Sequence, residues 1–455
     1  MTKPRQRMVD QAGDLAGEEP EPRASLTTVA YNVIEKQLIV GEIPPGALLS
    51  EASLSKAIGI GRTPVREALQ RLARERLVTI IQRKGARVSA IDIDQYMAGL
   101  SLRREVERVI VSNVALTASW PQRQSLHQLA AGLREAVESG DLAKALEMDR
   151  RFKLLEMEIC ENQFLSAAVR PLYGLARRFY FAQAVEPVRA VGLAQAALID
   201  HIARGDADAA GRASDAFIEA LARFGAEVGK PVGARTDEHS EIADIELRLA
   251  DRAYDLIEWK IVTGAYAVDE LLSEGQLSQE LGLGRTPVRE ALQRLAAHRL
   301  VTIVPRRGLL VTNFDAYALS RLTEARRPLE SMLCRLAARH ASREDRQRLA
   351  EVVEGIDGVT DYENGSAITL DQSAKTLLLK AAGNVFLADA IAPVHGLSRA
   401  LYFRKRSAPD LDVVRAQLSM LRAVVRGDEA EAGLGASRFV AEVARVMQQR
   451  REIWR

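Results

Sequence analysis

One long segment occurs twice in this sequence. Residues 62–80 read RTPVREALQRLARERLVTI and residues 285–303 read RTPVREALQRLAAHRLVTI, so 17 of 19 positions agree at an offset of 223. Further on, GLARRFYF at 174–181 aligns with GLSRALYF at 396–403 at an offset of 222. The two halves, of about 215 residues each, therefore align with a single one-residue gap. The 455 residues form one structural plan that is present twice.

Each half divides into a small mixed domain and a larger helical one. The small domain combines helical periodicity with short β-branched runs around a glycine, and the larger has apolar residues at i, i+3, i+4 and i+7 throughout. Between the halves, GKPVGARTDEHS has the composition of an exposed linker. We therefore expect a disordered tail at 1–24, small domains at 25–92 and 243–315, helical domains at 93–229 and 316–455, and a linker at 230–242.

The small domain has the pattern of a winged helix-turn-helix. A helix over 30–40 and a short helix from about residue 50 to 58 precede a third helix, for which Thr63 is the expected N-cap and Pro64 the first helical residue. Strands at 78–81 and 86–88 then flank a basic hairpin tip at 82–85. The predicted fold class is mainly α, with two winged helix-turn-helix domains that are each followed by an all-helical bundle.

The charge is concentrated in the repeated segments. The whole chain has a net charge of only +2, but residues 62–89 hold eight Arg and Lys against two Glu, and residues 285–312 hold six against one. These segments thus carry +6 and +5, and the remainder carries −9. The basic residues of one such helix could simply form a solvated face with its glutamates. The basic hairpin and the duplication instead favour a polyanionic binding partner such as DNA.

Two arginines of the third helix are placed to read DNA. Arg62 and Arg66 share one face at its N-terminal end, where the helix dipole favours phosphate, and an arginine there can reach guanine O6 and N7. Lys84 and Arg307, at the hairpin tips, suit contacts to the DNA backbone or the minor groove.

The string GRTPVREALQRLARERLV, followed by a hairpin with glycine, resembles the winged-helix domain of GntR-family transcriptional regulators. The helical domain is similar to the FCD effector domain of their FadR-like branch. The resemblance implies a repressor of transcription that binds double-stranded operator DNA. It implies operator contact by Arg62, Thr63, Arg66 and Gly85, and by Arg285, Thr286, Arg289 and Gly308. Some relatives have a further DNA-contacting Arg in the second helix, where this chain has Ala52 and Gly275.

Many FCD domains hold a divalent metal through one Asp and three His. Here the corresponding positions are Asp149, Lys153, Gln195 and Phe217 in the first half, and Asp371, Lys375, Gln417 and Phe439 in the second. A protonated lysine and a phenylalanine do not ligate a cation, so we expect no bound metal and no cofactor.

A helical domain that still binds a small organic acid would hold it through cationic and amide groups at the altered positions. The expected effector-binding residues are Asp149, Lys153, Arg177 and Gln195, with Asp371, Lys375, Arg399 and Gln417; Arg103 and Arg326 are weaker candidates. Lys153, four residues after Asp149, is also placed for an internal ion pair. The alternative is a structural salt bridge in a domain that binds nothing.

Three classes of function follow. The first is a ligand-responsive repressor, the second a DNA-bridging protein with inert helical dimerisation domains, and the third an enzyme or metabolite-binding protein. The enzyme is disfavoured because the six histidines lie in no catalytic or metal-binding spacing, and no G-x-x-x-x-G-K-[ST], G-x-S-x-G or H-E-x-x-H occurs. A single chain is expected to act as a pseudo-dimer through its two DNA-binding heads, the winged domains at 25–92 and 243–315. Alternatively, two chains pair as a homodimer with four heads.

The expected location is the cytoplasm. The chain has neither a run of about 18 uncharged apolar residues nor the apolar core of a signal peptide at its start, so no membrane partner is expected. Its two cysteines cannot form a disulfide framework.

Overall fold

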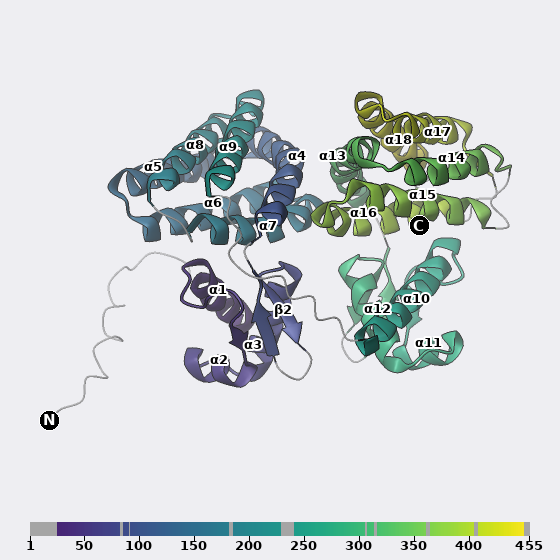
Figure 1. The fold of residues 1–455 in the computed structure, drawn as a ribbon, viewed down its shortest axis with the longest axis horizontal. Helices are drawn as coiled ribbons and strands as arrows, with labels where there is room; N and C mark the ends of the chain where they lie inside the picture. Colours follow the sequence, from purple (N-terminus) through teal and green to yellow (C-terminus); the bar gives the residue numbers. More distant parts are fainter. Residues whose placement is uncertain are drawn as a thin grey trace. The chain divides into compact units, whose positions relative to one another are not determined.

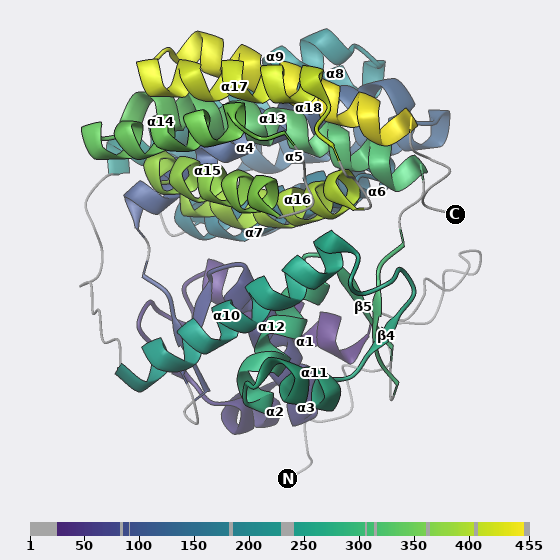
Figure 2. The ribbon, with the colours of Figure 1, turned by 90° about the vertical axis from the view of Figure 1, so that its right-hand side faces the viewer.

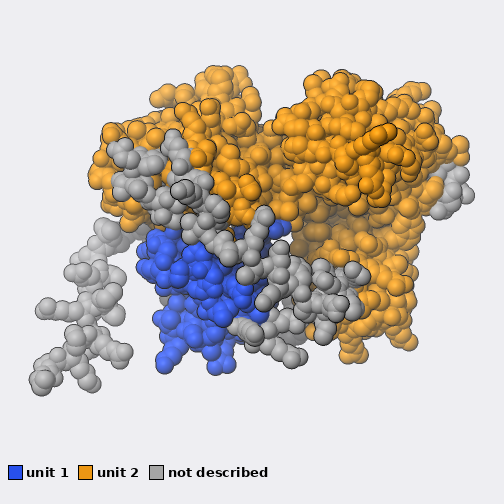
Figure 3. All heavy atoms as spheres, in the orientation of Figure 1, with its two compact units in different colours: residues 1–89 blue, residues 90–455 orange. Residues whose placement is uncertain are grey.

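The computed structural model describes residues 25–81, 85–90, 92–181, 185–228, 241–304, 307–313, 316–360, 365–404 and 408–449. Residues 1–24 and 229–240, where a tail and a linker are expected, lie outside this set, as does Lys84. The chain forms two compact units, residues 1–89 and residues 90–455 (Figure 3). None of the described helices is long and apolar enough to cross a membrane.

The first unit is a winged helix-turn-helix domain, as predicted. Its elements are α1 (Leu26–Ile39), β1 (Leu48–Leu49), α2 (Glu51–Ile58), α3 (Arg62–Arg74), β2 (Val78–Ile81) and β3 (Gly85–Val88). The strands form an antiparallel sheet in the order β1-β3-β2. The two-residue strand β1 was not expected from the sequence. The core lies between α1, α3 and the sheet, and is built by Ile34, Leu38, Val65, Leu69, Leu72 and Val78.

Local capping explains where the second helix begins and ends. The Ser50 hydroxyl accepts a hydrogen bond from the Ser53 backbone N–H at 3.0 Å, and Gly59 ends α2 with φ at 70°. The turn from Gly59 to Gly61 then leads directly into α3.

The predicted cap of the third helix is wrong. The helix begins at Arg62 with Gly61 as its N-cap, and no side chain caps it, whereas Thr63 lies inside the first turn. Pro64 is tolerated there because the first N–H groups of a helix have no partner within it. The equivalent helix in the second half has Gly284 at its N-cap and is likewise uncapped. Each uncapped first turn keeps backbone N–H groups available to an anion.

The second unit begins with α4 and contains the other winged domain. That domain consists of α10 (Glu241–Thr263), β4 (Leu271–Leu272), α11 (Glu274–Leu281), α12 (Arg285–Ala297), β5 (Val301–Val304) and β6 (Gly308–Val311). Its sheet order, β4-β6-β5, matches that of the first domain.

Two bundles of six helices make up the rest of the second unit (Figures 1 and 2). The first consists of α4 (Ile93–Thr117), α5 (Trp120–Ser139), α6 (Leu142–Cys160), α7 (Gln163–Phe181), α8 (Val185–Arg204) and α9 (Ala207–Val228). The second consists of α13 (Ala316–His340), α14 (Arg343–Asp357), α15 (Ser366–Ala382), α16 (Val385–Phe403), α17 (Leu411–Arg426) and α18 (Glu429–Gln449).

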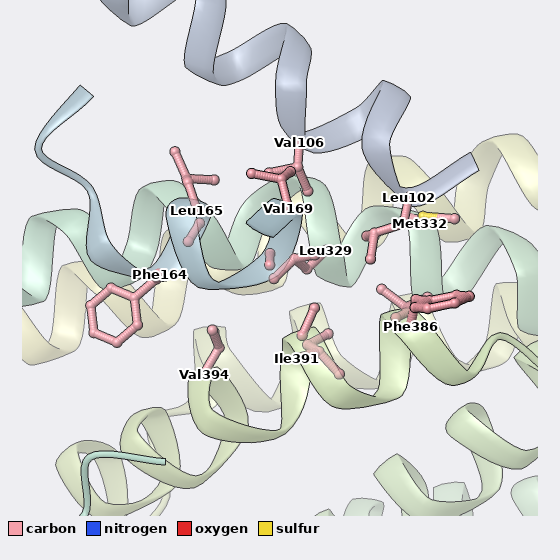
Figure 4. Close-up of a cluster of buried hydrophobic side chains, with 14 of the residues drawn as sticks. Leu102, Val106, Phe164, Leu165, Val169, Leu329, Met332, Phe386, Ile391 and Val394 are labelled. Carbon is pink, nitrogen blue, oxygen red and sulfur yellow. The ribbon is translucent and has the colours of Figure 1, made fainter. Parts of the chain in front are cut away.

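The two bundles pack on each other through equivalent helices. Helices α4 and α7 of the first contact α13 and α16 of the second. Buried apolar side chains fill this interface, among them Leu102, Val106, Phe164, Leu165, Val169, Leu329, Met332, Phe386, Ile391 and Val394 (Figure 4). They bring the two bundles together in one hydrophobic core.

A pair of asparagines shows the symmetry of the interface. The Asn162 side chain donates to the carbonyl of Arg321 at 3.0 Å, and the Asn384 side chain donates to the carbonyl of Ala98 at 3.0 Å. In the register of the repeat, Asn162 corresponds to Asn384 and Ala98 to Arg321. The two halves therefore exchange the same contact, as subunits do across an isologous two-fold interface.

Candidate DNA interface and effector pockets

Helix α3 presents a basic face that the sequence repeats in α12. Arg62, Thr63 and Arg66 are exposed on the first turns of α3, and Arg285, Thr286 and Arg289 are exposed on α12. Within the described ranges, the side chains of Arg62 and Arg285 form no hydrogen bond or ion pair, although their charges help to lower the pKa of Glu51 and Glu274. Both guanidinium groups are thus free to bind a ligand outside the chain.

The second arginine of each face is held by a glutamate from the preceding helix. Arg66 donates to both carboxylate oxygens of Glu51 at 2.8 to 3.0 Å, and Arg289 binds Glu274 in the same way at 2.8 and 2.9 Å. Hydrogen bonding to arginine lowers the pKa of both glutamates. Because 61% of each arginine side chain stays exposed, the pair fixes its direction without hiding it.

Not all of the basic charge of the repeat faces outward. Arg71 lies over the ring of Tyr31 at 3.7 Å and forms an ion pair with Glu75 at 3.4 Å. In the second domain, Arg294 lies over Tyr254 at 4.8 Å. These arginines join the third helix to the first, so the net charge of the segment overstates its DNA-binding charge.

The glycine after each hairpin tip allows the strands of the wing to pair closely. Gly85 has φ at 104° and Gly308 has φ at 124°. A Cβ at Gly85 would collide with the carbonyl oxygen of Leu49, and one at Gly308 with that of Leu272. Only glycine therefore lets the third strand pair this closely. Arg307, exposed beside Gly308, donates its backbone N–H to Val304 at 3.0 Å in the turn of the wing.

Each helical bundle contains a pocket at the position of the predicted effector site. The first has about 480 Å³ of empty space, including its open mouth. Asp149 lies in it and accepts hydrogen bonds from Arg177 and Gln195, each at 2.6 Å. Burial raises the pKa of Asp149, but Arg177 and Gln195 outweigh it, so the pKa lies below its ordinary value.

Lys153 does not pair with Asp149 as expected, and it does not line this pocket. It donates instead to Glu107 and to Glu156, the latter at 2.9 Å, and all three side chains are buried. Glu156 lies three residues on, and with Glu107 it draws the ammonium away from Asp149. Burial and the neighbouring Glu107 raise the pKa of Glu156.

The second pocket has about 510 Å³ of empty space, and here the expected ion pair forms. Lys375 donates to Asp371 at 2.7 Å and Gln417 donates to it at 3.3 Å. Leu378 stands where the first half has Glu156. Glu330, the counterpart of Glu107, is bound by Arg326 and His395, so Asp371 is the carboxylate that binds the lysine. Asp371, Lys375, Arg399 and Gln417 all line this pocket.

Both kinds of domain match known families. The model described as "Bacterial regulatory proteins, gntR family" matches residues 26–88 and 249–311. The FCD domain model matches residues 99–220 and 321–441.

The chain belongs to the GntR family.

Relatives in that family match parts of this chain. The HTH-type transcriptional repressor RspR of Escherichia coli is 28% identical over 142 residues, which are 31% of this chain and 62% of RspR. The E. coli regulator McbR is 29% identical over 130 residues, which are 29% of this chain and 59% of McbR. The E. coli repressor GlaR is 27% identical over 156 residues, which are 33% of this chain and 70% of GlaR. The chain thus spans about three fifths of the length of RspR and McbR.

Solved structures of GntR regulators align with one half of the chain. E. coli McbR/YncC aligns with 46% of this chain and 100% of its own length at 20% identity and a TM-score of 0.41. A GntR regulator from Rhodococcus aligns with 46% of this chain and 100% of its own length at 22% identity and a TM-score of 0.37.

The residues at the FCD metal position do not fit a metal in this GntR protein. In the first half Asp149 is already bound by Arg177 and Gln195, and in the second Asp371 is bound by Lys375 and Gln417. Phe217 and Phe439 line the pockets where the third imidazole would stand. Within the described ranges no group of three or more His, Cys, Asp or Glu is placed to hold an ion.

Several residues that organise these sites were not expected from the sequence. Glu51 and Glu274 bind Arg66 and Arg289, and Glu258 of α10 binds Arg399 of the second pocket. The repeat carried a signal for the first two, because a Glu occurs 15 residues before the arginine in both halves.

Proposed function

We propose that this chain is a ligand-responsive transcriptional repressor of the GntR family, with two DNA-reading heads, and that it carries out no catalysis. The observation that carries the proposal is the duplicated recognition face, with its exposed Arg-Thr pair, its glutamate-held arginine and its uncapped helix end. Two relatives are named as repressors, which supports the same sign of regulation here. A regulator of this kind acts in the cytoplasm.

On the operator, each third helix would enter a major groove. Arg66 and Arg289, kept extended by their glutamates, suit bidentate binding to guanine, and Arg62 and Arg285 suit phosphate at the helix end. Thr63 and Thr286 lie beside them, and the wings, with Lys84 and Gly85 or Arg307 and Gly308, would contact the backbone or the minor groove.

We further propose that one chain is a pseudo-dimer. The mutual contacts of Asn162 and Asn384, and the apolar interface between the bundles, support this assignment. Because two-fold proteins read two half-sites about one helical turn apart, one chain would cover one operator.

The pockets are the proposed effector sites. Arg177 and Gln195 in the first, and Lys375, Arg399 and Gln417 in the second, would bind a small organic acid around Asp149 or Asp371. Lys153 is turned toward Glu107 and Glu156, and would reach a ligand only after leaving them.

The test begins with an operator selected from random duplex DNA. Arg66→Ala and Arg289→Ala are each expected to weaken operator binding by about tenfold to a hundredfold, because each removes one bidentate base contact of roughly 1–3 kcal/mol. Each should also reduce the salt dependence of binding if the arginine touches phosphate as well. The control is Arg212→Ala, an exposed arginine on α9, which should bind the operator as the wild type does.

A single compact footprint, weakened by either substitution, is the expected result. If only one of the two variants loses affinity, the two-headed reading is wrong. Dispersed binding without a selected sequence would support the alternative of a DNA-bridging protein.

A further inference from the structure

Helix α16 contacts both the second pocket and the second winged domain. Ser398, Arg399, Tyr402 and Phe403 line the pocket from this helix. At Gly396, an added Cβ would lie 3.0 Å from the Glu258 carboxylate and 3.2 Å from Leu300, both in the winged domain. The pocket and the second winged domain therefore both contact this one helix.

One arginine reaches across this helix. The Nη2 of Arg399 donates to Glu258 of α10 at 2.9 Å, and its Nη1 lies 4.0 Å from the carboxylate of Asp371 in the pocket. Both carboxylates are buried. The Nε of Arg399 is buried and has no hydrogen-bond partner within the described part of the chain. The guanidinium thus has two acidic neighbours and an unused donor.

Cationic and apolar side chains line the pocket. Arg326, Lys375 and Arg399 lie in its wall with the carboxylate of Asp371, and Arg326 and Arg399 are also bound by Glu330 and Glu258, which lie outside the lining. Apolar side chains supply most of the remaining wall, among them Ile356, Val359, Val413, Val414, Phe439 and Val443. A monocarboxylate with a short hydrocarbon chain matches both features.

We propose that Arg399 is the switch between the second pocket and the second head. A carboxylate in the pocket binds Arg399 and draws its guanidinium away from Glu258. Glu258 is then a buried carboxylate without its cation, which is strongly unfavourable, so the winged domain loosens from α16. The ligand carboxylate and Glu258 thus compete for the same cation, Arg399, so ligand binding opposes docking of the winged domain on α16.

This inference rests on the proposed effector site and adds the route by which its occupancy reaches the DNA-binding domain. Arg399 acts here as both a ligand-binding and a positioning residue. Because linkage is reciprocal, weakening the Glu258 contact must strengthen ligand binding.

The experiment uses the full chain with hexanoate as the probe and hexanamide as its uncharged counterpart. Affinity is measured by isothermal titration, and the docking of the head by hydrogen exchange of the α10 amides. In the wild type, hexanoate and not hexanamide should bind and should speed exchange in α10. Glu258→Gln should bind hexanoate at least fivefold more tightly, with α10 exchange already fast and no longer responsive.

Two further variants separate this route from a merely structural role. Arg399→Lys keeps the charge but not the two-armed fork, so it should bind hexanoate and yet fail to transmit the change to α10. Glu280→Gln, in the same winged domain on α11, should behave as the wild type. Its carboxylate binds Lys260 and Tyr266, and not α16.

Hexanoate binding that is equally tight in the wild type and in Glu258→Gln would overturn the switch, as would a failure of hexanoate to bind to either. If Glu258→Gln does not fold, an α10 response to hexanoate in Arg399→Lys equal to that of the wild type overturns it. None of these results touches operator binding by Arg66 and Arg289. Failure of those two variants to weaken operator binding would overturn the proposed function instead.

Discussion

Equivalent residues of the two halves have different partners because single neighbours differ. Lys153 binds Glu107 and Glu156, whereas Lys375 binds Asp371. Leu378 replaces Glu156 in the second half, and Glu330, the counterpart of Glu107, is bound by Arg326 and His395. A second difference between the halves is a buried histidine in the second bundle. His395 stands where the first half has Tyr173, and its ring hydrogen-bonds Glu330 at 2.9 Å. The two pockets are therefore chemically distinct although their backbones repeat.

The buried histidine predicts a pH dependence of stability in the second bundle. Burial lowers the pKa of His395 to about 4, with Lys375 and Arg326 adding to this and Glu330 opposing it. Because a histidine in the unfolded chain has a pKa of about 6.5, the unfolded state binds more protons than the folded state between pH 4 and 6.5. Acidification from pH 6.5 to 5 should thus lower the free energy of opening by about 1.5 kcal/mol through this residue alone.

Hydrogen exchange of the α16 amides at several pH values measures this contribution. His395→Gln should remove the corresponding pH slope. His340→Gln, at an exposed position of α13, is the control and should keep it. An unchanged slope in His395→Gln would contradict the assignment.

At the scale of elements, the wing depends on a two-residue strand and a glycine. The strand β4 pairs Leu271 with Leu310 and Leu272 with Leu309, next to Gly308. The φ of 124° at Gly308 lies in a region that other residues rarely adopt. The strand order β4-β6-β5 therefore requires glycine at this point.

Gly308→Ala should accordingly destabilise the second winged domain by roughly 2 kcal/mol or more, from backbone strain and the contact with Leu272. The matched control is Gly275→Ala, which has open space around it and restores the alanine that the first domain has at position 52. This change in α11 should stabilise the helix by up to about 1 kcal/mol. Chemical unfolding of the two variants measures the difference, and similar effects of both would refute the role of Gly308.

At the scale of the whole molecule, the bundles are joined as two subunits of a dimer would be. Phe164 and Val169 of α7 correspond to Phe386 and Ile391 of α16, and all four are buried in the shared core. Such an interface does not depend on the peptide connection between the halves. The linker would serve instead to keep the local concentration of the second half high.

Cutting the chain should therefore leave the halves together. We expect that a protease site inserted between residues 230 and 240 yields, after cleavage, two fragments that elute together at the position of the uncut protein, whose natural chain has a mass of 50.0 kDa. Val169→Asp combined with Ile391→Asp should separate them, because two unpaired charges would be buried at the interface. Separate elution of the fragments without these substitutions would show that the linker, and not the interface, holds the halves.

The sequence by itself determined the repeat, the fold class and the family, and it predicts the arginines of α3 and α12 that would contact DNA. These are carried by local signals: helical periodicity, glycine punctuation and a near-identical string of residues. It misplaced the cap of α3 by assigning it to Thr63, because a serine or threonine before a proline is a common start and Gly61 offers no side chain to compare.

Only the tertiary structure decided which charged groups meet. The two-residue strands pair with segments far along the chain, Lys153 contacts Glu107 46 residues away, and Arg399 contacts Glu258 141 residues away. No local pattern encodes such pairs. Each buried cation binds the carboxylates that packing brings within reach, and replacing Glu156 by Leu378 and Tyr173 by His395 changes which carboxylates those are.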